Sequence, residues 1–590
     1  MEPMRYLRML SNAALGGALG AAYVTVLLLQ LNPQVPLESP GVWRWFVRML
    51  LFYGTHLTVL FYVLLVLREI LGSRMLSPAW ISVRVLAWLA AITAGAASML
   101  MWSNLQNFGI VLAPETMRRM LLGAVATTAS AVVLVGIVIL RYSFGRRGSA
   151  VSGALLALAV TGSLVLPMAA RGLGTPPRLD PQHGSPAVEG PDPGARPSRI
   201  VLIVLDGASL DYLWPRVIAG QFPNFGRILD SGAAIDLATT RPTQAEPVWA
   251  AVATGKYPPK NGIRSAATYR VRPSGAPIDL LPDGCYAYGL IQFGVVLTEP
   301  HTPAAWSART MWEIAGGYGL PVGIVRWPVT YPATRPVRGF LVTDRFHTLF
   351  GSPIADVEHA VYPSTIVPIA RTVFAQERSA DHRGILPADG PEVAVAEEWA
   401  GASPERLDRL YGQLAETLAA ETPVSLLAVR YQGLDTVAHS YLRFAEPRAF
   451  GDVSETERAQ YGAVLDRYYR YIDGEVGRAM AGLRGDDLLL VVSGFGMQPV
   501  GPGKRLLARL LRAPDLTGTH EEAPDGFLLA WGPHVVKGKL ARGSVVDVTP
   551  TVLYYLGLPV GRDMDGFART DLFSRGYTIG HPITYIPSHH

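Results

Sequence analysis

The sequence contains little charge and almost no cysteine. Charged residues make up 17% of the 590 positions and hydrophobic residues 49%, whereas charged residues are about a quarter of a typical soluble protein. The single cysteine, Cys285, excludes a disulfide bond within the chain, and its Asp-Gly-Cys-Tyr turn predicts a structural role. The chain is too long for one hydrophobic core, so we expect at least two independently packed parts.

The N-terminal part also lacks lysine and aspartate. Residues 1–178 contain 14 arginines and four glutamates, and the remainder of the chain contains 38 basic and 43 acidic residues. The net charge of +5 therefore comes from the N-terminal part, and the rest of the chain is slightly acidic. Nucleic-acid binding needs clustered positive charge on a folded domain, so we predict no nucleic-acid partner.

Five apolar stretches are long enough to cross a bilayer, which takes about 20 residues. They comprise residues 11–31, 45–67, 79–102, 119–140 and 149–170. A cleaved signal peptide is an alternative for the first, but four further stretches behind it favour an uncleaved anchor. Only His56 is an ionisable residue well inside a stretch, so we interpret the bundle as an anchor in membrane lipids rather than a transport pathway.

Arginines indicate the orientation of this anchor, because arginine-rich loops stay in the cytoplasm. The predicted cytoplasmic segments contain Arg5, Arg8, Arg68, Arg74, Arg141, Arg146 and Arg147. Arg118 and Arg119 lie on the opposite side and weaken the bias. An odd number of spans then places the C-terminal domain outside. We therefore predict a multi-pass protein of the cytoplasmic (inner) membrane of a bacterium, with a periplasmic C-terminal domain.

Residues 172–198 are rich in glycine, proline and polar residues, a composition that does not fold. We predict a five-helix transmembrane anchor (1–171), this tether and an extracytoplasmic domain (199–590). In that domain, short apolar runs alternate with amphipathic stretches, which predicts an α/β fold with a parallel sheet and helices on both faces. The expected strands are 200–205, 321–325, 424–429, 488–492 and 527–530, and the expected helices include 224–230, 306–315, 405–420, 455–481 and 546–556.

Polar residues follow several of these strands, at the edge where the chemistry of such sheets collects. Asp206 follows the first strand in an Asp-Gly turn. Asp435 and His439 follow the third strand and, being four apart, share one face of a helical turn, as zinc ligands can. His520 lies in a polar loop before the last strand. Taken singly, each has a structural alternative: a turn aspartate, a surface carboxylate beside a capped histidine, and an ordinary loop histidine.

Several motifs in order along the chain carry more information. They are FPNFGRIL, PTQAEPVWAAVATGKYPPKNGI, WPVTYPATRPVRGFLVTDRF, the Asp435–His439 segment, GTHEEAPDGF and VVDVTPTVLYYLGLPVGRDMDG. Together they resemble the alkaline phosphatase superfamily, specifically its type I phosphodiesterase/nucleotide pyrophosphatase branch, from residue 200 to about residue 573. The resemblance implies an alkaline phosphatase-like fold, two divalent ions that clamp a phosphoryl group, and substrate choice by insertions at about 264–305 and 347–398.

By this resemblance, Asp435, His439 and His520 match the complete ligand set of one ion. The second ion would need Asp206, an Asp–His pair and the oxygen of a Ser or Thr nucleophile. The pair normally follows a strand in a Ser-Asp-His-Gly sequence, but here the strand runs into SGFGMQPV. Either Gly494 and Phe495 replace the pair or two residues have been lost there, and both readings remove the ligands.

The nucleophile of the family normally lies four residues before the Trp of PVW, and this position is Ala245. A methyl group cannot attack phosphorus. Thr243 and Glu246 are candidate substitutes, but Thr243 would lie roughly 6–7 Å away along an extended segment, and the side chain of Glu246 diverges from its neighbour's. The resemblance thus implies one intact half-site, for one divalent metal that we expect to be zinc, and one degenerate half-site.

Three functions remain open on this sequence. The first is a degenerate phosphodiesterase-like domain, a pseudoenzyme that binds one metal and holds a phosphorylated lipid, glycan or nucleotide without efficient turnover. The second is an active single-zinc phosphoester hydrolase in which the ion activates water for direct attack. The third is a non-catalytic structural subunit of a membrane complex, with partner proteins and a metal that serves stability alone.

Overall fold

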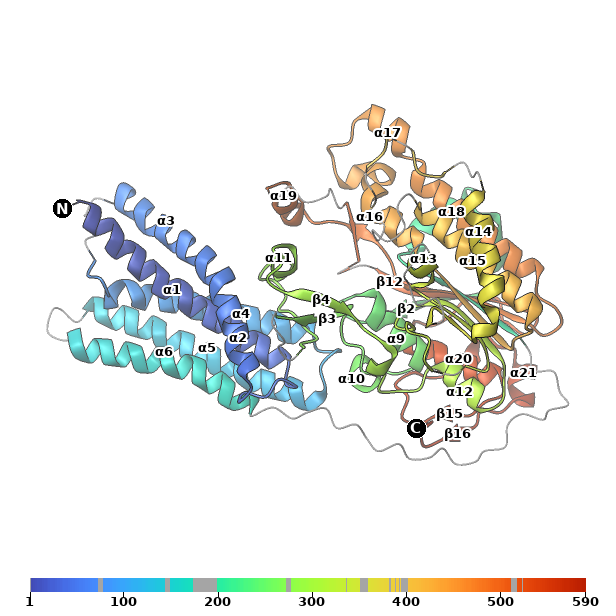
Figure 1. Cartoon of the computed structure of the whole chain (residues 1–590), viewed down its shortest axis with the longest axis horizontal. Helices are drawn as coiled ribbons and strands as arrows, with labels where there is room; N and C mark the ends of the chain where they lie inside the picture. The colour runs from blue at the N-terminus through green and yellow to red at the C-terminus, as the bar shows by residue number, and fades with distance from the viewer. Residues whose placement is uncertain are drawn as a thin grey trace. The chain divides into compact units, whose positions relative to one another are not determined.

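The computed structural model describes residues 2–72, 78–143, 149–172, 199–271, 277–335, 337–350, 359–380, 384–387, 389–391, 393, 402–510, 517–520, 522 and 524–589. The chain divides into two compact units (Figure 1). The first combines Met1–Asp180 with Ala267–Pro300, and the second combines Pro181–Ala266 with His301–His590. Apart from Gly172, the predicted tether lies outside the described residues, as does much of the predicted insertion at 347–398. The boundaries of the three predicted parts stay a prediction.

The first unit contains a bundle of long apolar helices. Its helices are α1 (Glu2–Leu31), α2 (Pro40–Met49), α3 (Thr55–Leu71), α4 (Val83–Asn107), α5 (Pro114–Ser143) and α6 (Ser149–Arg171). A π-helical turn, Leu50–Gly54, joins α2 to α3, and five continuous helices are long and apolar enough to cross a membrane, as predicted. Large hydrophobic side chains such as Val59, Trp88 and Val132 are exposed on the bundle, where lipid would cover them.

The segment Ala267–Pro300 belongs to this first unit, although it lies within the predicted domain 199–590. It contains an antiparallel pair of strands, β3 (Ala267–Arg270) and β4 (Leu297–Pro300), and the short helix α11 (Tyr288–Gln292). Two asparagines of the bundle hold it by pairing with its backbone. Asn32 donates to the carbonyl of Leu280 at 2.7 Å and accepts from its N–H at 3.0 Å. Asn104 bonds both backbone groups of Asp283 in the same way.

The second unit is built on one large sheet with strand order β13-β2-β12-β9-β1-β8-β5-β6-β7. Strands β9, β1, β8, β5 and β6 are parallel neighbours, whereas β12 runs antiparallel to both β9 and β2, so the sheet is mixed. The strand bounds are β1 (Ile200–Leu205), β2 (Ala233–Ala238), β5 (Val322–Trp327), β6 (Gly339–Thr343), β7 (Val361–Tyr362), β8 (Leu426–Tyr431), β9 (Leu488–Phe495), β12 (Asp525–Trp531), β13 (Gly538–Lys539) and β14 (Gly543–Ser544). The predicted α/β fold is confirmed, but the sheet is not parallel throughout as predicted, because β12 and β7 run antiparallel to their neighbours.

Helices cover both faces of this sheet because successive side chains of each buried strand point to opposite faces. In β1, the side chains of Ile200, Leu202 and Val204 pack into one hydrophobic cluster, and the alternate residues pack into the other. The first cluster includes α9 (Ala245–Thr254), α12 (Met311–Gly317) and α20 (Val548–Tyr555). The second includes α8 (Pro223–Ser231), α14 (Val367–Ser379), α15 (Pro404–Glu421), α16 (Gly433–Ala445) and α18 (Val464–Ala481).

The expected strands lie close to the observed ones, but two of the expected helices differ. The stretch 306–315 is helical only from Met311, where α12 begins. The stretch 455–481 forms two helices, α17 (Glu455–Tyr461) and α18, instead of one. Ser454 and Glu457 form a capping box that starts α17, and the helix ends at Gly462, where the chain turns into α18. Sequence reasoning did not identify β2, β6 or α9, of which α9 is part of the candidate site.

We expect the Asn32→Ala substitution to loosen the attachment of Ala267–Pro300. It leaves the buried backbone groups of Leu280 without their partners, at a cost of about 1–3 kcal/mol. Hydrogen-exchange mass spectrometry on the detergent-solubilised chain should then show faster exchange of the amides of residues 279 and 280. The matched control is Asn107→Ala, because Asn107 makes only an exposed hydrogen bond to the Asp283 carboxylate. Equal exchange in the two variants would contradict the proposed attachment.

Candidate metal centre

Three of the predicted ligands come together at the carboxyl-terminal edge of the sheet. Asp435 and His439 lie one turn apart on α16, which follows β8. His520 follows the short strand β11 (Gly518–Thr519). One ligand atom from each residue lies within 4.8 Å of the others, and among the residues that the structure describes, this is the one such cluster of three.

Backbone carbonyl groups fix the orientation of both imidazole rings. Nδ1 of His439 donates to the carbonyl of Gly518 at 2.8 Å, and Nδ1 of His520 donates to the carbonyl of Thr243 at 2.9 Å. With the proton on Nδ1, the Nε2 atom of each ring carries the free lone pair. Metal-binding histidines are typically held in this way.

The carboxylate of Asp435 has a free position for a cation. Its Oδ2 atom lies 3.5 Å from Nε2 of His439, whereas its buried Oδ1 atom accepts no hydrogen bond within the described part of the chain. Gly207 approaches it closely with a left-handed φ of 70°, and a Cβ atom at Gly207 would lie 3.0 Å from Asp435 Oδ1. The donor set therefore fits a divalent ion.

A second buried group fixes the start of α16. Asp408 on α15 accepts hydrogen bonds from the backbone N–H groups of Gln432 and Gly433, which are otherwise unpaired at a helix N-terminus. Tyr468 donates to the same carboxylate at 2.8 Å, and Arg326 pairs with it at 2.5 Å. Because Asp435 lies two residues after Gly433, this carboxylate also positions the first metal ligand.

Arg326 reaches Asp408 because the end of β5 is irregular. The register of β5 against β6 shifts between Val325 and Trp327, and Arg326 has a left-handed φ of 61°. The side chain thereby leaves the alternation of the strand and turns toward α15, where its guanidinium group lies 4.6 Å from the ring centroid of Tyr411. Non-glycine residues rarely adopt this conformation, and such strain is common at functional sites.

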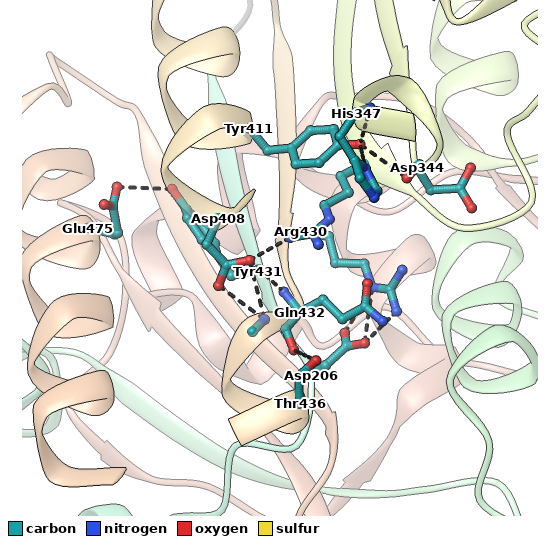
Figure 2. Close-up of polar contacts among 12 residues, drawn as sticks. Asp206, Asp344, His347, Asp408, Tyr411, Arg430, Tyr431, Gln432, Thr436 and Glu475 are labelled. Carbon is teal, nitrogen blue, oxygen red and sulfur yellow. Dashed lines mark hydrogen bonds and ion pairs between the residues drawn. The ribbon is translucent and has the colours of Figure 1, made fainter. Parts of the chain in front are cut away.

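Asp206 is not part of the three-ligand cluster and pairs with an arginine. Its carboxylate accepts from Nε of Arg430 at 2.9 and 3.1 Å and also from Nη2 of the same side chain. Figure 2 shows the carboxylate and the guanidinium group facing each other. Both side chains are almost fully buried, with 1% and 4% exposure. The role of Asp206 as a metal ligand stays a prediction.

The position expected for the nucleophile lies at the first residue of α9. Ala245 begins this helix, and Glu246 follows it. Burial raises the pKa of Glu246 to about 7, against the opposing charge of Arg430. The hydroxyl group of Thr243 is buried and donates to the carbonyl of Thr240 at 3.1 Å. Whether Thr243 or Glu246 substitutes for a nucleophile stays a prediction.

Strand β9 passes without interruption through the positions expected for the lost Asp–His pair. Ser493 is level with Leu205 of β1, and the strand continues to Phe495. The ring of Phe495 lies 5.0 Å from the ring of His520. A Cβ atom at Gly494 would lie 2.3 Å from Cγ1 of Val248 on α9, so the helix packs directly against the backbone here. Whether Gly494 and Phe495 replace the pair or two residues have been lost there stays open.

A family model described as type I phosphodiesterase/nucleotide pyrophosphatase matches residues 200–544, which is more than half of the chain. The chain belongs to this family. The matched range includes Asp206, Ala245, Asp435, His439 and His520. No curated protein sequence matches the chain.

Three solved structures are similar to the family domain at low identity. Murine ectonucleotide pyrophosphatase/phosphodiesterase 5 is 15% identical, covers 64% of this chain and 100% of its own, and has a TM-score of 0.37. The human form is 13% identical with the same coverage and a TM-score of 0.36. A mutant of alkaline phosphatase PafA is 14% identical, covers 65% of this chain and 100% of its own, and has a TM-score of 0.39.

Sequence reasoning missed the buried charges of the site, namely Arg326, Asp408 and Arg430. One signal was available for Arg430, because an arginine within the apolar run LLAVRY is a charge inside a buried strand. Such a charge requires an anionic partner. The sequence does not say which acidic residue that partner is.

The Gly494→Ala substitution should destabilise the second unit by about 1–3 kcal/mol, because its methyl group overlaps Val248. The thermal unfolding midpoint of the full-length protein measures this. The control is Gly474→Ala on α18, where a Cβ atom meets nothing within 4 Å and where alanine should stabilise the helix by about 0.5–1 kcal/mol. A Gly494→Ala protein as stable as the parent would show that α9 can yield and that the lost aspartate could be restored directly.

Proposed function

We propose that this protein is a membrane-anchored member of the phosphodiesterase family that binds one divalent ion and holds a phosphoester with weak or absent turnover. The observation that carries this proposal is the complete cluster of Asp435, His439 and His520 beside Ala245. The cluster would hold the ion, and Ala245 stands where the family's nucleophile is expected. The site thus has the ligands to bind an ion but lacks the side chain expected to attack phosphorus.

Two imidazole nitrogens and one carboxylate oxygen form a donor set typical of zinc, and three protein ligands leave a fourth position open. An ion bound there supplies positive charge that polarises a phosphoryl oxygen. The chain's own residues do the rest: the carbonyl groups of Gly518 and Thr243 orient the two rings, and Asp408 fixes the helix that carries Asp435. These contacts favour a preformed binding site.

The other half of the site supports the proposal that turnover is weak or absent. Ala245 has no group that can form a phospho-enzyme intermediate. Gly494 and Phe495 offer no metal-binding atoms in their side chains, and Phe495 fills the space beside the ring of His520 with carbon. The packing of Val248 against Gly494 leaves no room for an aspartate without a shift of α9.

The anchor and the family together suggest the ligand class. We propose that the domain lies on the extracytoplasmic (periplasmic) side of a bacterial inner membrane, because the arginine-rich segments of the bundle favour the cytoplasm. The family description names nucleotide pyrophosphatase and phosphodiesterase activities. A domain tethered to a membrane meets phosphorylated lipids and glycans at high local concentration, so these are the phosphoesters that we favour over soluble nucleotides.

Purified full-length protein should contain about one divalent ion per chain, measured by inductively coupled plasma mass spectrometry. The His520→Ala substitution should remove most of that ion, because it deletes one of three ligands. The matched control is His534→Ala, since His534 is an exposed histidine that pairs with Asp486 away from the cluster. Equal metal content in His520→Ala and the parent would contradict the proposed centre.

Hydrolysis of p-nitrophenyl phosphate and bis(p-nitrophenyl) phosphate tests the second part of the proposal. We expect rates close to those of the His520→Ala variant, because no nucleophile is present at residue 245. Rapid turnover that depends on His520 would instead support the single-zinc hydrolase. In that case Glu246, with its pKa near 7, is the residue to test as a general base through Glu246→Gln.

A further inference from the structure

Arg430 lies on β8 and pairs with Asp206, which follows the neighbouring strand β1. It is the fifth residue of β8, and its alternation with Leu426 and Ala428 places it on the sheet face covered by α9. Asp206 extends the matching series of β1 on the same face. The two residues are 224 positions apart in sequence, yet the parallel register of β1 and β8 brings them together.

Among the described residues, the guanidinium group of Arg430 is the one side-chain partner of the Asp206 carboxylate. Both carboxylate oxygens accept hydrogen bonds from the same arginine, and the side chains are nearly excluded from solvent. Glu246 at the start of α9 and Asp344 after β6 are also close enough for their charges to act on Arg430. Only the carboxylate of Asp206 is in hydrogen-bond contact with Arg430 in the described part of the chain.

A buried carboxylate such as that of Asp206 is also a group that a divalent cation could bind. An arginine can replace such a cation because its charge persists at any physiological pH and its planar fork binds a carboxylate through two parallel hydrogen bonds. A cation at Asp206 would have to displace a buried guanidinium group, and would leave that charge without its partner at a large energetic cost.

We propose that Arg430 is the permanent substitute for the second divalent ion of the site, so that Asp206 is the counter-ion of an arginine and not a metal ligand. This inference rests on the proposed one-metal centre and explains its stoichiometry. It also gives Asp206 a role that does not need an Asp–His pair, because the residue balances a buried charge.

Metal content and thermal unfolding of three full-length variants test this assignment. In Asp206→Asn, the metal content should stay at the parent value, because the amide replaces a carboxylate that holds no ion. In Arg430→Met, the unfolding midpoint in chelator-treated buffer should fall by about 5–10 °C, because Asp206 is left buried and unpaired. Millimolar MnCl₂ should raise the unfolding midpoint of Arg430→Met by more than it raises that of the parent. The reason is that the Asp206 carboxylate, no longer paired with Arg430, can bind the ion.

The double variant Asp206→Asn/Arg430→Met is the matched control. It removes both charges, so its midpoint should lie above that of Arg430→Met and should respond to MnCl₂ no more than the parent. If Arg430→Met does not accumulate as folded protein, metal content in Asp206→Asn and in the parent decides the question.

A parent protein with two ions per chain would contradict both the one-metal proposal and this assignment. Loss of an ion on Asp206→Asn would overturn this assignment alone. That result does not depend on the His520→Ala experiment, which tests whether the first ion binds at Asp435, His439 and His520. A failure of the proposed function is therefore distinguishable from a failure of this inference.

Discussion

Charged groups buried at the ends of parallel strands impose the main constraint on the second unit. Arg430 near the end of β8 and Arg326 near the end of β5 have very little exposure to solvent, and an unpaired charge there would cost several kcal/mol. Asp206 and Asp408 neutralise them across distances of many residues. Asp408 also binds the N-terminus of α16. The ion pair between Asp408 and Arg326 therefore also helps to position Asp435, the first ligand of the metal cluster.

The two halves of the site follow from this arrangement in different ways. On one side, each histidine donates Nδ1 to a backbone carbonyl, so that Asp435, His439 and His520 present free donor atoms. In the other half of the site, the side chains of Arg430 and Phe495 lie beside Asp206 and His520. Arg430 supplies positive charge to Asp206, and the ring of Phe495 packs against His520. In the arrangement that we propose, Arg430 takes the place of a second cation and the other half of the site holds one ion.

The division of the chain differs from a simple anchor followed by a domain. Since Ala267–Pro300 packs with the first unit, the chain passes from one unit to the other three times. The attachment uses Asn32 and Asn104, whose amide groups satisfy buried backbone donors and acceptors. Hydrogen bonds of this kind matter most where water is scarce, as at the end of an apolar bundle. The segment predicted to be a specificity insertion has, in this structure, a place in the membrane-anchored unit.

The sequence by itself determined the features that short contiguous segments encode. These are five apolar stretches, the main strands, and the Asp435–His439 pair on one helical face. Hydrophobic periodicity and spacing within one turn suffice for these. Only the tertiary structure decided that Asp206 faces Arg430, that Phe495 covers His520, and that Asn32 holds residue 280. The physical reason is that a buried polar group needs a partner, but the identity of that partner depends on strand register and helix packing between segments hundreds of residues apart.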